Sequence, residues 1–111
     1  MAVFAKGSVV IVPYPFSDLT GSKLRPALVL AQVSAGDYIL CQITSKPYSS
    51  RIIVEIDPTM NPASGLVHTS FARPEKLFTA HESIIREQIG KLRTAQLITV
   101  VGEVLKLIEV H

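Results

Sequence analysis

Short runs of β-branched and other apolar residues recur along this chain, separated by segments rich in proline, glycine and small polar residues. The alternation Ile52, Val54, Ile56 places three apolar side chains on one face, as expected for a strand with one buried side. Prolines and glycines between the runs are typical of turns and loops. We therefore predict five or six short antiparallel strands, at Val9–Val12, Ala27–Val33, Tyr38–Thr44, Arg51–Ile56, Leu66–Ala72 and Lys76–Ala80.

The period of the pattern changes near the C-terminus. From Leu97 onward, apolar residues recur at the spacing i, i+3, i+4, i+7, which predicts an amphipathic helix with Thr94 as its N-cap. A further strand is the competing interpretation of this segment. Together the predicted elements give a mainly β fold class, a small curled antiparallel sheet or partial barrel with a C-terminal helix, as a single domain over residues 1–111.

Composition narrows the class of protein. Apolar residues make up 48% of the 111 residues, enough for a core without disulfides. The single cysteine, Cys41, excludes a disulfide within the chain and fits a reducing cytoplasm. Neither a signal peptide nor an apolar run of about 20 residues is present, so we predict a cytoplasmic protein without a membrane partner. The formal net charge of +2 permits nucleic acid as a partner without arguing for it.

Common catalytic and cofactor motifs are missing. His68, His81 and His111 are far apart, and neither HxxxH nor CxxC occurs, so we predict no metal site and no cofactor. Phosphate-binding glycine loops and the GxSxG elbow are also absent. Cys41 lies in the middle of a predicted strand, which favours a buried structural thiol over a nucleophile.

Two polar positions stand at the ends of neighbouring predicted strands. Arg25 precedes the second strand in "SKLRPALVLAQV", and Thr44 and Ser45 end the third. If these strands pair as a hairpin, the guanidinium and the hydroxyls meet at one rim of the sheet, an arrangement suited to a phosphodiester. The structural alternative is that Arg25 pairs with a carboxylate, from Asp18 or Glu75, and that the hydroxyls cap a turn.

The chain also resembles a known family. The segments "KGSVVIVPYPFSDLTGSKLRPALVL", "YILCQITS", "HTSFARPEKLFT" and "IGKL", in this order, are similar to the MazF/PemK toxins of bacterial toxin–antitoxin systems. The resemblance implies a strongly curved, SH3-like sheet and a homodimer. It also implies a sequence-specific endoribonuclease that cleaves single-stranded RNA without a metal, with the ribose 2′-hydroxyl as nucleophile. A cognate acidic antitoxin protein would neutralise it.

The resemblance assigns roles by position. Arg25 would stabilise the pentacovalent phosphate and help to protonate the leaving oxygen, with the electrostatic role favoured because an arginine is a poor general base. Thr44, with Ser45 beside it, would hydrogen-bond the scissile phosphate or help with proton transfer. Lys46 stands where many members have glutamine. The loop over residues 13–23 is shorter and less acidic than usual in the family, which leaves the RNA sequence that is cleaved undefined.

Further residues are predicted to contact RNA, and each has a structural alternative. Tyr14 and Phe16 would stack on bases or pack against the sheet. His68 would serve as a proton shuttle or as an ordinary strand histidine. The full set is Tyr14, Phe16, Asp18, Lys23, Lys46 and His68, with Arg51 and Arg73 as further cations along the phosphate backbone.

Two other functions compete with RNA cleavage. One is a non-catalytic binding module of the same fold, which grips DNA gyrase or RNA, and the other is a degenerate member kept as a structural partner. The presence of both Arg25 and Thr44 favours a nuclease over the degenerate member.

Overall fold

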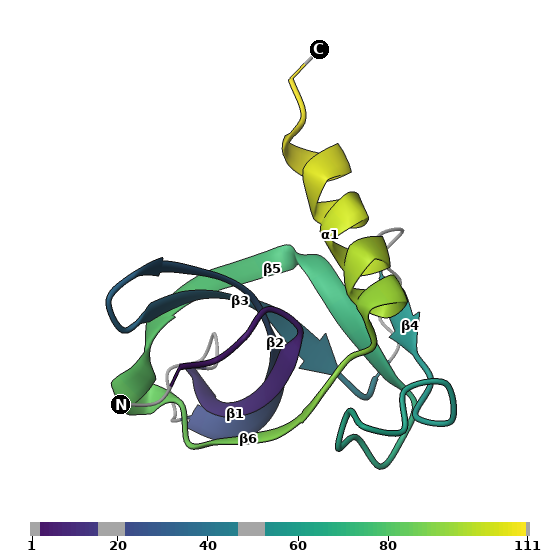
Figure 1. Cartoon of the computed structure of the whole chain (residues 1–111), viewed down its shortest axis with the longest axis horizontal. Helices are drawn as coiled ribbons and strands as arrows, with labels where there is room; N and C mark the ends of the chain where they lie inside the picture. Colours follow the sequence, from purple (N-terminus) through teal and green to yellow (C-terminus); the bar gives the residue numbers. More distant parts are fainter. Residues whose placement is uncertain (1–2, 16–21, 47–52, 111) are drawn as a thin grey trace.

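The computed structural model describes residues 3–15, 22–46 and 53–110. Its strands form one six-stranded antiparallel sheet in the order β4-β5-β3-β2-β1-β6, and Figure 1 shows the sheet curling into a half-barrel with helix α1 outside it. This confirms the mainly β fold class with a C-terminal helix. The strands are β1 (Ser8–Pro15), β2 (Ser22–Ser34), β3 (Asp37–Thr44), β4 (Val54–Ile56), β5 (Ser70–His81) and β6 (Glu87–Lys91); a 3-10 turn, η1, spans Glu82–Ile84 and α1 spans Thr94–Ile108.

Both faces of the sheet are buried, which explains the nearly continuous apolar runs. Val9 belongs to a cluster with Leu28 and Val100 of α1, whereas the next residue, Val10, belongs to a second cluster with Val29. Successive side chains of a strand point to opposite faces, so neighbouring valines contribute to different cores. Helix α1 covers the first cluster, where it packs against β5 and β4 (Figure 1).

The strands around the predicted site are longer than the sequence pattern indicated. β1 continues to Pro15 and β2 already begins at Ser22, so Arg25 lies inside β2 instead of before it. Arg25 is paired with Val12, and Pro26 with Ile11. The cross-strand pairing of polar residues such as Lys23 with Tyr14 extends the hairpin beyond its apolar part. Of the predicted strand Arg51–Ile56, only Val54–Ile56 is a strand, and residues 51–52 lie outside the described part.

The two strands predicted around "RPE" are in fact one. In β5, Arg73 pairs with Gln42 and Leu77 pairs with Cys41, so residues 74–76 bulge out of the ladder. Because proline has no N–H to donate, a bulge accommodates Pro74 without ending the strand. The prediction of a strand from Leu66 was wrong at its start, because β5 begins at Ser70 and residues 66–69 belong to an irregular segment.

The C-terminal part differs from the prediction in two respects. β6, an edge strand paired with β1, was not predicted, because Glu87, Gln88 and Lys91 give it no apolar alternation. Thr94 is the first helical residue of α1 and not its N-cap. Arg93 holds the cap position, without a side-chain hydrogen bond to the helix. The competing strand interpretation of this segment is wrong.

An irregular segment, residues 57–69, closes the half-barrel by packing on β6. We call this contact the seam. The Lys91 N–H donates a hydrogen bond of 2.8 Å to the Ala63 carbonyl. A Cβ atom on Gly90 would overlap the backbone of Ala63 and Ser64, and one on Gly65 would overlap that of Ile89. Two glycines therefore allow the two backbones to approach this closely.

Candidate active site

The register of the central strands brings Arg25 and Thr44 together. Ala27 pairs with Gln42 and Leu28 with Cys41, and the same register continued by two residues places Arg25 opposite Thr44. Cross-strand partners in an antiparallel pair project to the same face, with Cβ atoms about 4.5–5.5 Å apart. The printed pairing of β2 with β3 ends at Ala27 and Gln42, so a continued register would make Arg25 and Thr44 neighbours on the face of those two residues, at the rim where β3 ends.

Thr44 holds its hydroxyl in a defined place. The side chain is buried, with 7% exposed, and its Oγ1 accepts a hydrogen bond of 3.2 Å from the Lys46 N–H. Because a hydroxyl has one proton and two lone pairs, this bond leaves the proton available for a ligand. Ser45 and Lys46 follow it and are exposed.

Arg25 is half-buried on β2, and no hydrogen bond or ion pair joins it to another described residue. Of the two carboxylates considered as its partner, Glu75 instead lies near Arg73, with 3.7 Å between Oε1 and Nε. The other, Asp18, lies outside the described residues. The guanidinium therefore has no counter-charge among the described residues, and its donor fork is of the kind that binds phosphate.

A second arginine reaches the same face. Arg73 pairs with Gln42, two residues from Thr44, so it belongs to the row adjacent to the Arg25–Thr44 row. Its side chain is only 16% exposed. From the sequence, Arg73 was predicted only as one of several cations along the phosphate backbone of the RNA. The bulge at residues 74–76 sets its register, and no periodicity in the sequence reveals that bulge.

Cys41 supports this arginine from the core. The thiol is buried and donates a hydrogen bond of 3.2 Å to the Arg73 carbonyl. Burial raises the pKa of Cys41 to about 12, against an ordinary value of 9.0. A thiol that stays protonated is not a nucleophile. Cys41 is thus a structural residue, as its position in the strand indicated.

Tyr14 packs inside the barrel. Its ring meets Phe78 edge to face, with 4.9 Å between centroids, and its hydroxyl is buried without a hydrogen-bond partner among the described residues. Burial, and secondarily the nearby Cys41, raises its pKa. This arrangement corresponds to the packing alternative for Tyr14. Its stacking on bases remains a prediction.

The other predicted RNA contacts are spread more widely. Lys23 is exposed on β2, and His68 is exposed in the segment before β5, not in a strand. Phe16, Asp18 and Arg51 lie outside the described residues. Within the described ranges, no three His, Cys, Asp or Glu side chains gather where they could hold a metal ion. No helix in those ranges has the length and apolar character needed to cross a membrane.

Comparisons with known proteins agree on a single family. A family model described as "PemK-like, MazF-like toxin of type II toxin-antitoxin system" matches residues 5–108. A MazE–MazF crystal structure from Deinococcus radiodurans shares the fold with a TM-score of 0.78 at 20% identity, over 100% of both chains. A mycobacterial endoribonuclease in complex with its cognate antitoxin gives 0.76 at 12% identity, over 98% of each chain. The toxin MazF-mt6 of Mycobacterium tuberculosis gives 0.67 at 19% identity, over 92% of this chain and 98% of its own. No curated protein matches the chain.

Proposed function

Because this chain belongs to the PemK-like, MazF-like toxins of type II toxin–antitoxin systems, we propose that it is an endoribonuclease that cleaves single-stranded RNA at short specific sequences. The observation that carries the proposal is the cross-strand placement of Arg25 opposite Thr44, derived from the pairing of β2 with β3. A permanent positive charge beside a positioned hydroxyl is suited to a phosphodiester that gains negative charge during reaction.

The proposed reaction draws its nucleophile from the substrate. The ribose 2′-oxygen attacks the adjacent phosphorus and loses its proton to solvent, the bond from phosphorus to the 5′-oxygen of the next nucleotide breaks, and that oxygen takes up a proton from solvent. The products are a 2′,3′-cyclic phosphate and a 5′-hydroxyl end. This chemistry requires no thiolate, imidazole or metal ion from the protein.

The protein's part is electrostatic and positional. Arg25 stabilises the charge on the pentacovalent phosphate, and it does not act as a base because a guanidinium keeps its proton. Thr44 donates its hydroxyl proton to a phosphate oxygen, and Ser45 lies next to it. Arg73 adds a second positive charge on the same face. Lys23 and Lys46 extend the basic surface along the RNA.

Cleavage of a fluorogenic single-stranded RNA in EDTA, with the ends mapped, tests this function. Arg25→Ala should lower kcat by a factor of about 10²–10³, the loss typical of a removed transition-state donor. Thr44→Val should also lower kcat. Lys76→Ala, at an exposed position of β5, is the matched control and should leave the rate unchanged.

Activity that disappears in EDTA and returns with magnesium would overturn the metal-free mechanism. Full activity of Arg25→Ala would remove Arg25 from the site. A protein that leaves RNA intact but binds DNA gyrase would establish the non-catalytic alternative.

We also propose that the protein has two protein partners, an acidic antitoxin and a second copy of itself. The relatives from Deinococcus and from mycobacteria include toxin–antitoxin complexes. A homodimer is supported by α1, which carries an exposed apolar stripe beside its buried residues Val100 and Val104. The stripe consists of Ile98, Leu105 and Ile108, exposed at 65%, 57% and 65%, with Val101 and Gly102 between them.

Gly102 favours a close helix contact. A mid-helix glycine costs about 0.5–1 kcal/mol relative to alanine, and here a Cβ would meet nothing within 4 Å. The stripe carries no charge, so two copies can pack on it symmetrically without burying an ion. We assign it to the second copy for these reasons.

A further inference from the structure

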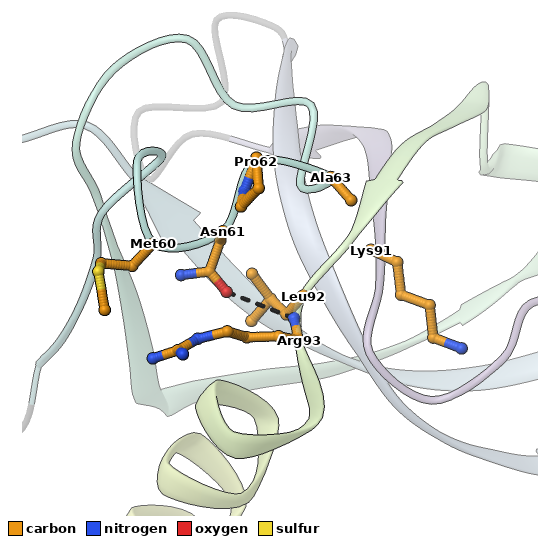
Figure 2. A pocket seen from close by; sticks show the side chains of 7 residues that line it. All are labelled: Met60, Asn61, Pro62, Ala63, Lys91, Leu92 and Arg93. Atoms are coloured by element: carbon orange, nitrogen blue, oxygen red, sulfur yellow. Dashed lines mark hydrogen bonds between the residues drawn. The ribbon is translucent and has the colours of Figure 1, made fainter.

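A pocket opens at the seam, between the segment that follows the edge strand β4 and the end of the other edge strand, β6. Its walls come from the segment 57–69 and from the junction of β6 with α1, and its volume is about 290 Å³. Figure 2 shows the lining side chains arranged around it. We call it the seam pocket; it is lined by Met60, Asn61, Pro62, Ala63, Lys91, Leu92 and Arg93.

The walls of the seam pocket are fixed by hydrogen bonds. Asn61 is 1% exposed, and its Oδ1 accepts a bond of 3.3 Å from the Arg93 N–H, drawn in Figure 2. Its Nδ2 donates to Gln96 Oε1 at 3.3 Å and to the Asp57 carbonyl at 3.2 Å. One buried amide thus ties the irregular segment to the start of α1. A preformed cavity of this kind costs little ordering when a ligand binds.

Charge at the rim selects the ligand. Lys91 and Arg93 are exposed and flank the buried Leu92, and neither forms an ion pair with another described residue. None of the described residues that line the pocket carries a carboxylate. Two cations without a counter-charge beside an apolar cavity fit an occupant that has an apolar group flanked by negative charges.

The lining favours peptide over nucleic acid. Bases stack mainly on aromatic side chains, and none of the described lining residues is aromatic; the apolar part of the lining is aliphatic or thioether, from Met60, Pro62, Ala63 and Leu92. Such a cavity accepts an aliphatic or aromatic side chain. Carboxylates before and after that side chain would then reach the two cations.

We propose that the seam pocket binds an acidic segment of the antitoxin, by taking up one apolar side chain while flanking carboxylates pair with Lys91 and Arg93. The antitoxin as occupant rests on the proposed function. The pocket itself shares no residue with the Arg25–Thr44 site. It would give the antitoxin a second anchor that leaves the RNA-facing rim unchanged.

Titration of the ¹⁵N-labelled protein followed by NMR tests the recognition chemistry. The probe is a synthetic Glu-Glu-Leu-Glu-Glu peptide. We expect it to shift the amide signals of Ala63, Lys91 and Arg93, and to bind at least about fivefold more tightly than Glu-Glu-Ala-Glu-Glu, the loss expected for one buried aliphatic side chain. Lys-Lys-Leu-Lys-Lys should not shift these signals.

Matched variants distinguish binding in the seam pocket from a general effect of the protein's charge. The double variant Lys91→Glu/Arg93→Glu should lower the affinity for the acidic peptide about tenfold or more, because it reverses both charges at the rim. Lys76→Glu/Arg86→Glu makes the same change in net charge at exposed positions outside the pocket and should leave binding unchanged. The side chain of Met60 is 53% exposed. Met60→Asp should lower the affinity for the leucine peptide more than the affinity for the alanine peptide.

Three results would overturn the proposal: equal binding of the leucine and alanine peptides, equal loss in both charge-reversal variants, or seam shifts caused by oligouridylate and not by the peptide. The last result would make this surface part of the RNA path. RNA cleavage by Lys91→Glu/Arg93→Glu is measured in parallel and should equal that of the parent. A protein that binds the peptide but cleaves no RNA would refute the proposed function and leave the pocket standing.

Discussion

Two neutral groups that ionise only at high pH, the Cys41 thiol and the Tyr14 phenol, are buried beneath the candidate site. Cys41 fixes the backbone of Arg73, and Tyr14 packs on Phe78. Neither is placed to exchange protons with RNA at neutral pH. Their shifted pKa values are a property of the fold, and they predict how stability depends on pH.

The free energy of unfolding should fall as the pH rises from 9 towards 12. The pKa of Cys41 rises from 9.0 to about 12 on folding, and that of Tyr14 rises from 10.0, so each contribution is complete below the unfolded pKa and is lost at higher pH. Tyr14→Phe should reduce this loss. At pH 7 the variant should be unchanged or more stable by up to about 1 kcal/mol, because it removes a buried hydroxyl without a partner among the described residues.

Urea unfolding of both proteins at pH 7 and pH 11 measures these effects. A parallel pH dependence in the variant and the parent would contradict the role given to Tyr14. Hairpin geometry predicts that Arg25 lies near Thr44, and the pairing of β2 with β3 has the register that this prediction needs. The position of Arg73 was not predictable, because it depends on how many residues β5 leaves unpaired.

At the scale of helices and strands, the local pattern of apolar residues is sufficient to predict some elements and misses others. β1 and β3 were predicted because each is a short apolar run bounded by turn residues, and α1 because its apolar residues follow the period of a helix. β6 was missed because it is a polar edge strand whose partner, β1, lies some 80 residues earlier. β5 was divided in two because a proline was taken as an end, whereas tertiary pairing absorbs it in a bulge.

Gly90 in β6 should not tolerate a side chain. Gly90→Ala places a methyl group against the backbone of Ala63 and Ser64, which have no room to move, so we expect a loss of roughly 1–3 kcal/mol in the free energy of unfolding. Gln88→Ala, two residues away on the same strand and exposed, should change it by less than about 0.5 kcal/mol. Chemical denaturation measures both, and equal effects would show that the seam is looser than described.

At the scale of the whole molecule, closure of the half-barrel depends on contacts between distant segments. The segment 57–69, β6 and α1 meet at the seam through Gly65, Gly90 and Asn61. No sequence pattern predicts this contact, because each glycine taken alone is typical of a turn. The overall curl was predictable from the number of short strands with apolar faces to bury, but the way it closes was not.

The apolar stripe of α1 predicts the assembly of the molecule. Leu105→Glu puts a charge in the middle of the proposed contact and should convert a dimer into a monomer in light scattering coupled to size exclusion, since burying an unpaired charge is costly. Thr99→Glu adds the same charge on the polar side of α1 and should leave the dimer intact. A parent protein that is monomeric at all concentrations would refute the assignment of the stripe.

The pairing of β1 with β6 also has a consequence for biosynthesis. β1 leaves the ribosome before the other five described strands, and β6, which covers its outer edge, leaves last of the six. Until then, the nascent chain presents an uncovered strand edge, which is a template for aggregation. A chain released before Glu87 should therefore accumulate as insoluble material and not as a smaller folded protein.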